Sequence, residues 1–237
     1  MSAPRKELVV LLIGPSGSGK SSFVKSLTSE TVRVDSRRPC TDVCKAYKVE
    51  PTINGHRKAF ILIDTPGFVD PQDVNLDILQ NIAETLAKLA PGGVFGAIYF
   101  HNITEVRMKG TSLSVLDVFK AICGREFYPH IAFVTTMWDT IQEKFHAKFQ
   151  ITNKELEDGP MRLKDAPEIF KRLRDDDECS KKVLEHFLLL ARKRPAPPPL
   201  HLMKELRGDT RNVGNTAAGR RILKDDRSGP STCCTVL

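Results

Sequence analysis

Between Glu7 and Ser21 an apolar run over residues 8–13 leads into Gly14-Pro15-Ser16-Gly17-Ser18-Gly19-Lys20-Ser21, and this segment is the most informative in the sequence about the fold. The second part fits the pattern G-x-x-x-x-G-K-[ST] at every fixed position, between an expected strand and an expected helix. Backbone N–H groups of such a loop converge on phosphate oxygens, and the glycines permit close approach. We expect Lys20 to reach the β- and γ-phosphates, Ser21 to bind Mg²⁺ and Ser22 to join the cradle; the alternative is a glycine-rich turn with a chance lysine.

Strand-like and helix-like stretches alternate outward from this loop to about residue 190. Strands are expected over residues 7–13, 43–49, 59–63, 94–100 and 131–135, and helices over 20–28, 75–90, 113–123, 140–149 and 183–191. This alternation predicts an α/β fold with a mostly parallel central sheet and helices on both faces. The turn dipeptide Asn54-Gly55 predicts that the strands 43–49 and 59–63 are antiparallel neighbours.

Composition narrows the class of protein. The 237 residues carry a net charge of +7, but Lys and Arg are mixed with Asp and Glu throughout and no strongly basic block of five or more occurs, so we expect no binding to nucleic acid. The six cysteines lack the spacing of a metal site, and the first apolar run is too short for a membrane span. Its position between Glu7 and a glycine-rich loop argues against an export signal. These features predict a reduced, cytoplasmic protein.

A second candidate motif, Asp64-Thr65-Pro66-Gly67, follows the expected strand 59–63. A carboxylate at that place can hold Mg²⁺ through water, and the N–H of Gly67 can donate to a γ-phosphate. The alternative is an ordinary strand-to-loop turn.

A third motif, Thr136-Met137-Trp138-Asp139, follows the expected strand 131–135. The Asp139 carboxylate can accept hydrogen bonds from the ring N–H and exocyclic amine of guanine, a pair that adenine does not offer. The alternative for Asp139 is an N-cap of a helix expected to begin with a capping box at Thr140 and Glu143. Trp138 either shields the base edge or fills the core.

Thr41, in the polar stretch 35–42, is the candidate switch threonine that closes over Mg²⁺ and the γ-phosphate. Thr31 and Ser36 compete for that role, and an ordinary loop threonine is the further alternative. Lys20, Thr41 and Gly67 form the predicted catalytic set, and Ser21, Thr41 and Asp64 the predicted Mg²⁺ ligands.

The ordered set of motifs resembles the translation-factor-related (TRAFAC) P-loop GTPases over roughly residues 7–190. The form Asp64-Thr65-Pro66-Gly67-Phe68 is similar to septins, immunity-associated GTPases and chloroplast import receptors, and residues 135–139 resemble fungal septin-like G-domain proteins. The resemblance implies a Ras-like fold, GTP or GDP with Mg²⁺ as ligands, an effector or activating protein, and a homodimer across the nucleotide face.

Three departures from that pattern matter. Phe68 stands where Ras-like enzymes place the glutamine that orients the attacking water, so hydrolysis should be slow or completed by a partner, a second subunit, Arg37 or Arg38. Met137 replaces the usual lysine of the base motif. The S-A-[KL] loop that usually backs the base is absent, and we expect a substitute between Phe170 and Asp175.

The remaining sequence divides into a lead over residues 1–6, a G domain over 7–192 and a flexible, proline-containing tail over 193–237. The chain ends Cys234-Thr235-Val236-Leu237, a C-a-a-X box that predicts geranylgeranylation of Cys234, with Cys233 as a palmitoylation candidate. The alternative is a chance cysteine. A lipid on this tail would hold the protein at the cytosolic face of a membrane.

The sequence therefore predicts a slow GTPase that acts as a membrane-anchored molecular switch. Two rivals stay open: a non-hydrolysing module that uses bound GTP for dimerisation or scaffolding, and a P-loop kinase or ATPase.

Overall fold

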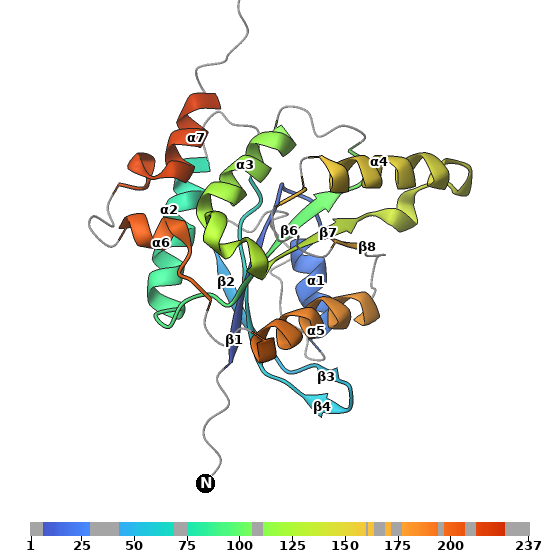
Figure 1. Ribbon diagram of the computed structural model, residues 1–237, viewed down its shortest axis with the longest axis horizontal. Coiled ribbons are helices and arrows are strands. Elements are labelled where there is room, and N and C mark those ends of the chain that lie inside the picture. The colour runs from blue at the N-terminus through green and yellow to red at the C-terminus, as the bar shows by residue number, and fades with distance from the viewer. Residues whose placement is uncertain are drawn as a thin grey trace, which may run out of the picture.

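The computed structural model describes residues 7–28, 43–68, 75–105, 111–159, 161–163, 169–171, 177–193, 197–206 and 212–225. Its centre is a six-stranded sheet with the order β2-β5-β1-β6-β7-β8. The parallel strands are β1 (Leu8–Ile13), β5 (Phe60–Asp64), β6 (Gly96–Asn102), β7 (Ile131–Thr136) and β8 (Ile169–Lys171). This arrangement confirms the predicted mostly parallel sheet (Figure 1).

The antiparallel exception is the edge strand β2 (Lys45–Val49), which pairs with β5 as predicted. Between them a short hairpin joins β3 (Thr52–Ile53) to β4 (His56–Arg57). Its turn holds Asn54 and Gly55 at φ 50° and 75°, the left-handed conformation that this dipeptide favours.

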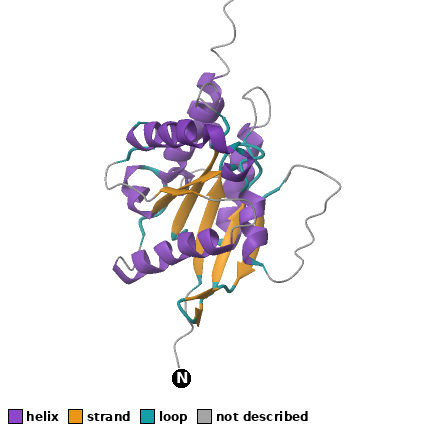
Figure 2. Cartoon of the chain, turned by 90° about the vertical axis from the view of Figure 1, so that its right-hand side faces the viewer, coloured by secondary structure: helices purple, strands orange, loops and turns teal. Residues whose placement is uncertain are grey.

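Both faces of the sheet are covered by helices, as Figure 2 shows. On one face Val10 and Leu12 pack with residues of α1 (Lys20–Leu27) and α5 (Asp177–Lys193). On the other face Leu11 and Ile13 pack with residues of α2 (Asn75–Leu89) and α3 (Thr111–Cys123). Because side chains alternate along a strand and both faces are buried, β1 must be apolar at every central position.

The helix expected over residues 140–149 begins later than predicted. Trp138–Thr140 and Glu143–Phe145 form the 3₁₀ turns η2 and η3, and α4 runs from His146 to Asp158. The hydroxyl of Thr140 donates to the carbonyl of Met137 at 2.7 Å, so it closes a turn instead of capping a helix. The predicted capping box is therefore wrong.

The C-terminal region also differs from the prediction of a flexible tail over 193–237. Residues 197–206 and 212–225 contain α6 (His201–Leu206), η4 (Val213–Asn215) and α7 (Ala217–Asp225), and α7 packs on α3. The pairs Leu202/Leu206 and Ala218/Ile222 are buried at helical spacing, and the Glu205 carboxylate accepts the N–H of Ala217 at 3.0 Å. The prediction is wrong for these residues, because their apolar stripes complete the core over α2 and α3.

Candidate nucleotide-binding site

The loop over residues 14–19 connects β1 to α1 at the carboxyl edge of the parallel strands. Gly17 and Gly19 have φ of 73° and 92°, a left-handed conformation that costs other residues energy. A Cβ atom at Gly14 would lie 2.5 Å from the carbonyl oxygen of Phe100. Steric demands at three of its positions thus explain why this loop is rich in glycine.

Lys20 begins α1 and is 6% exposed, and its ammonium donates to the carbonyls of Gly14 and Pro15 at 2.9 Å each. Burial lowers the pKa of Lys20 to about 8, against an opposing effect of the nearby Asp64 carboxylate. A buried ammonium needs anionic or acceptor partners. The loop carbonyls therefore hold the Lys20 charge at the place where a polyphosphate would bind.

Ser21 and Asp64 form the second half of this centre. The Ser21 hydroxyl donates to Asp64 Oδ2 at 2.7 Å, whereas Oδ1, also buried, has no hydrogen-bond partner among the described residues. Burial raises the pKa of Asp64, and the hydrogen bond from Ser21 and the charge of Lys20 oppose that rise.

This donor set fits Mg²⁺. Within the described residues no group of three or more His, Cys, Asp or Glu side chains could hold a metal by itself. Mg²⁺ is usually bound through one or two protein oxygens together with phosphates and water, and it does not need such a cage. The unpaired Asp64 oxygen beside the Ser21 hydroxyl supplies that kind of partial site.

The segment after Asp64 lies against the phosphate loop. The N–H of Ser16 donates to the carbonyl of Phe68 at 2.9 Å, and the N–H of Phe68 donates to the carbonyl of Gly14 at 3.3 Å. A Cβ atom at Gly67 would lie 2.4 Å from Ser16 Cα. The Phe68 ring is 1% exposed and belongs to the core, so it cannot orient a water molecule as a glutamine would.

A buried threonine links the phosphate loop to the expected base-binding segment. Thr136 ends β7, and its hydroxyl donates to the carbonyl of Ser18 at 2.9 Å. Met137 then adopts φ 64°, and Asp139 lies exposed in η2. The residue that caps α4 is Phe145, so the alternative of Asp139 as the cap of that helix is excluded.

Trp138 fills the core, one of the two roles that the sequence left open. Its side chain is 5% exposed and packs in the cluster of α2 and α3, while its Nε1–H donates to the hydroxyl of Thr135 at 3.0 Å. On its ring lies the ammonium of Lys171, the last residue of β8, at 5.0 Å from the ring centroid. Sequence reasoning did not single out Lys171, although it lies in the stretch where a substitute loop was expected.

Several predicted residues fall outside the described part of the chain: Thr41, its competitors Thr31 and Ser36, the arginines 37 and 38, and the lipidation candidates Cys233 and Cys234. Ser22 lies exposed on α1. The structure thus brings together Gly14 to Ser21 with Asp64, Gly67 and Thr136. The roles of these residues in binding, like those of the other predicted site residues, stay predictions.

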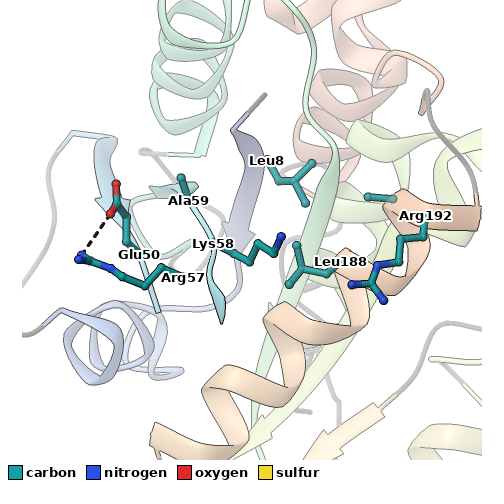
Figure 3. Close-up of a pocket in the computed structure, with 8 residues that line it drawn as sticks. Leu8, Glu50, Arg57, Lys58, Ala59, Leu188 and Arg192 are labelled. Atoms are coloured by element: carbon teal, nitrogen blue, oxygen red, sulfur yellow. Dashed lines mark ion pairs between the residues drawn. The ribbon is translucent and has the colours of Figure 1, made fainter. Parts of the chain in front are cut away.

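A separate hollow lies at the opposite edge of the sheet (Figure 3). Its volume is about 420 Å³, and it is lined by Leu8, Glu50, Arg57, Lys58, Ala59, Leu188, Ala191 and Arg192. Leu8 begins β1, whereas the phosphate loop follows the end of that strand. The hollow is therefore not part of the candidate nucleotide site.

Comparisons with known proteins agree with this geometry. Residues 9–91 match the family described as 50S ribosome-binding GTPase. The structure resembles a dimerization-deficient variant of Toc33 from Arabidopsis thaliana with a TM-score of 0.60 at 21% identity, covering 82% of this chain and 88% of that chain. The chain carries a P-loop GTPase domain.

Two curated proteins share this domain. GTP-binding protein A of Dictyostelium discoideum is 27% identical over 137 residues, which cover 58% of this chain and 29% of the relative. Translocase of chloroplast 34 homolog of Chlamydomonas reinhardtii is 29% identical over 149 residues, which cover 58% and 36%. The chain spans about a third of the length of these relatives. The comparisons support the P-loop GTPase fold without singling out the septin-type subgroup.

Further structures show the same fold. Toc33 in complex with GDP and Mg²⁺ matches with a TM-score of 0.57 at 20% identity, covering 83% of this chain and 88% of that chain. A structure of the chloroplast translocon components atToc33 and psToc159, for whose GTPase activity dimerization is important, matches with a TM-score of 0.54 at 20% identity, covering 81% and 86%. At this identity the likeness concerns the fold alone.

Proposed function

We propose that this chain binds GTP with Mg²⁺, hydrolyses it slowly and acts as a molecular switch. One observation carries the proposal: a complete phosphate loop ends in the hydrogen bond from Ser21 to Asp64, whose second oxygen is buried and unpaired among the described residues. An apolar core would not retain an unpaired carboxylate oxygen without a ligand to offset its burial.

Each part of the nucleotide has a matching group in this proposal. Loop N–H groups and Lys20 hold the phosphates, Ser21 and Asp64 hold the metal, and Asp139 accepts from the guanine edge. Thr41 and the N–H of Gly67 engage the γ-phosphate, so that both switch segments are ordered with GTP and released after hydrolysis. Matched structures of Toc33 with GDP and Mg²⁺ support this choice of ligands.

Slow intrinsic hydrolysis follows from the burial of Phe68. A partner, Arg37 or Arg38, or a second copy of the chain would have to complete the transition-state contacts. We favour a homodimer across the nucleotide face, because dimerization is important for the GTPase activity of the structurally similar translocon components.

Membrane attachment through Cys234, with Cys233 as a second acyl site, completes the proposal and places the switch at the cytosolic face of a membrane. Among the described residues, no helix has the length and apolar character needed to cross a bilayer. One lipid chain binds a membrane only marginally, so the second cysteine gives stable attachment. Loss of the membrane fraction in cells that express a Cys234→Ser variant, with Cys233→Ser giving partial loss, is the expected result.

The first experiment measures GTP, GDP and ATP binding with Mg²⁺ and follows phosphate release over a series of protein concentrations. We expect guanine-selective binding, with turnover per molecule rising with concentration because dimers form. Selective binding without turnover at any concentration would favour the non-hydrolysing scaffold, and ATP preference would favour a kinase or ATPase. Equal affinity for GTP and ATP would refute the proposal.

A further inference from the structure

At the carboxyl edge of the sheet, beside the residues of the base motif, lies a cation that the predicted motifs do not include. Lys171 ends β8, and its register partner on the parallel strand β7 is Thr135, which precedes the base motif. Because the carboxyl ends of parallel strands meet at one edge of the sheet, Lys171 reaches the same edge as residues 136–139. Its ammonium lies 5.0 Å from the centroid of the Trp138 ring.

Two hydrogen bonds hold the Trp138 side chain beside β8. The Nε1–H of Trp138 donates to the Thr135 hydroxyl at 3.0 Å, and that hydroxyl donates to the carbonyl of Phe170 at 3.4 Å. Trp138 is thereby tied to β8 one residue before Lys171. An ammonium within about 6 Å of an indole face is attracted by its quadrupole, so the Lys171 side chain has a preferred place over Trp138, the residue that precedes Asp139.

The chemistry of guanine defines what this cation can read. The edge of guanine presents the carbonyl O6, the ring N1–H and the exocyclic N2 amine in a row. A carboxylate pairs with the two donors and cannot pair with O6, which needs a hydrogen-bond donor. Adenine carries an amine at that place, which an ammonium would leave unpaired and repel.

Resting on the proposed GTP function, we propose that Lys171 is a specificity-determining residue whose ammonium, held over Trp138, donates to guanine O6. Asp139 reads N1–H and N2, so the two side chains of opposite charge match the whole edge. Met137 cannot supply a cation, because it is apolar and leaves β7 in a left-handed turn. Lys171 thus supplies the hydrogen bond to guanine O6, for which none of the predicted motifs provides a donor.

The test compares Lys171→Met with Lys144→Met in the full chain. Lys144 is a matched control, because it is also exposed and also lies 5.0 Å from an aromatic centroid, that of Phe145. The probes are GTP, which has O6, and the triphosphate of 2,6-diaminopurine riboside, which keeps the N2 amine but carries an amine in place of O6 and no hydrogen on N1. The effect of each variant is therefore taken relative to wild type for each nucleotide separately. Affinities are measured by calorimetry with Mg²⁺.

We expect Lys171→Met to weaken the binding of GTP about tenfold, the loss typical of a charge-assisted hydrogen bond at an accessible site. Binding of the diaminopurine nucleotide should be unchanged or tighter. Lys144→Met should change the affinity for neither nucleotide, and Lys171→Arg should keep most of the preference for GTP over the diaminopurine nucleotide. If Lys171→Met lowered the affinity for both nucleotides equally, or left the affinity for GTP unchanged, the inference would be overturned. The proposed function would survive that result as long as the wild-type protein prefers guanine. A wild-type protein without guanine preference would overturn both this inference and the proposed function.

Discussion

The two ends of the candidate nucleotide site are built in different ways. At the phosphate end, Lys20 and Asp64 are 6% and 1% exposed, and most contacts come from the backbone of one short loop. At the base end, Asp139 lies exposed in η2 after β7, and Lys171 is an exposed side chain at the end of the neighbouring strand β8. The proposed binding of phosphate thus depends on one short, buried segment of the chain, whereas the proposed reading of the base depends on tertiary assembly.

The largest effect is expected at the phosphate end, from Lys20→Met. Removing one partner of a buried charge pair costs about 4 kcal/mol, so affinity for GTP and GDP should fall about a thousandfold together. Calorimetry with both nucleotides measures this. Lys25→Met, exposed on the same helix, is the control and should bind normally. A loss confined to one nucleotide would contradict a shared phosphate site.

Asp139→Asn tests the base end. We expect about a hundredfold weaker GTP binding, because an amide cannot accept both guanine donors, together with tighter binding of the xanthosine nucleotide. Competition between the two nucleotides for the same protein gives the ratio. An unchanged ratio of the two affinities would mean that Asp139 does not read the base. The proposed base end of the site would then have no residue that recognises guanine through its N1–H and N2 donors.

His101 tests the strand beneath both ends. Its imidazole is fully buried in β6, and neither ring nitrogen has a hydrogen-bond partner among the described residues. Burial lowers the pKa of His101 to about 4 from an ordinary 6.5. Between these values the unfolded chain binds a proton that the folded chain does not, so the free energy of unfolding falls as the pH decreases through this range.

His101→Leu should remove this pH dependence. Relative to wild type, the variant should gain about 2 kcal/mol of stability between pH 7 and pH 5, measured by urea unfolding at each pH. Comparison with wild type cancels the contribution of Asp64, which both proteins share. His56→Leu, exposed on β4, serves as the control. A constant difference between the His101 variant and wild type would show that the imidazole does not titrate in this range.

The smallest effect is expected from Trp138→Phe. The phenyl ring at position 138 can still form a cation–π contact with Lys171. The loss of the hydrogen bond to Thr135 lowers the free energy of unfolding by about 1 kcal/mol. GTP affinity should fall only about threefold, since 0.6 kcal/mol corresponds to roughly that factor. Thermal unfolding and calorimetry measure the two quantities. A loss as large as that of Asp139→Asn would mean that the indole itself contacts the base.

The same difference between the ends explains what could be predicted from the sequence. Residues 14–21 form one contiguous motif, so the strand, the loop and the helix that follows could be predicted from local patterns. A second local motif, residues 64–67, marked Asp64 as a candidate Mg²⁺ ligand, but its hydrogen bond with Ser21 was not predicted. The uninterrupted apolar run over residues 8–13 likewise indicated a strand buried on both faces of a sheet. Guanine reading by Asp139 remains a prediction, because no described contact involves a base.

The errors arose where tertiary contacts decide. Lys171 was not singled out from the sequence, because its position beside the base motif depends on the pairing of β8 with β7, which no spacing along the chain reveals. The proline run at 195–199 indicated the start of a flexible tail, yet Leu202, Leu206, Ala218 and Ile222 are buried against the G domain. Their spacing was visible in the sequence, but short amphipathic segments form helices only when a packing surface stabilises them.

The backbone hydrogen bonds between Phe68 and residues 14–16 have a consequence for the kinetics of nucleotide exchange. A ligand that requires the N–H of Ser16, or the space beside Gly67, binds the fraction of molecules in which these bonds are open. If that fraction is about one in a hundred, the apparent affinity is about a hundredfold below that of the open form. GTP, which extends to Gly67, would then associate more slowly than GDP, and a protein that pulled Phe68 from the loop would speed the association of GTP.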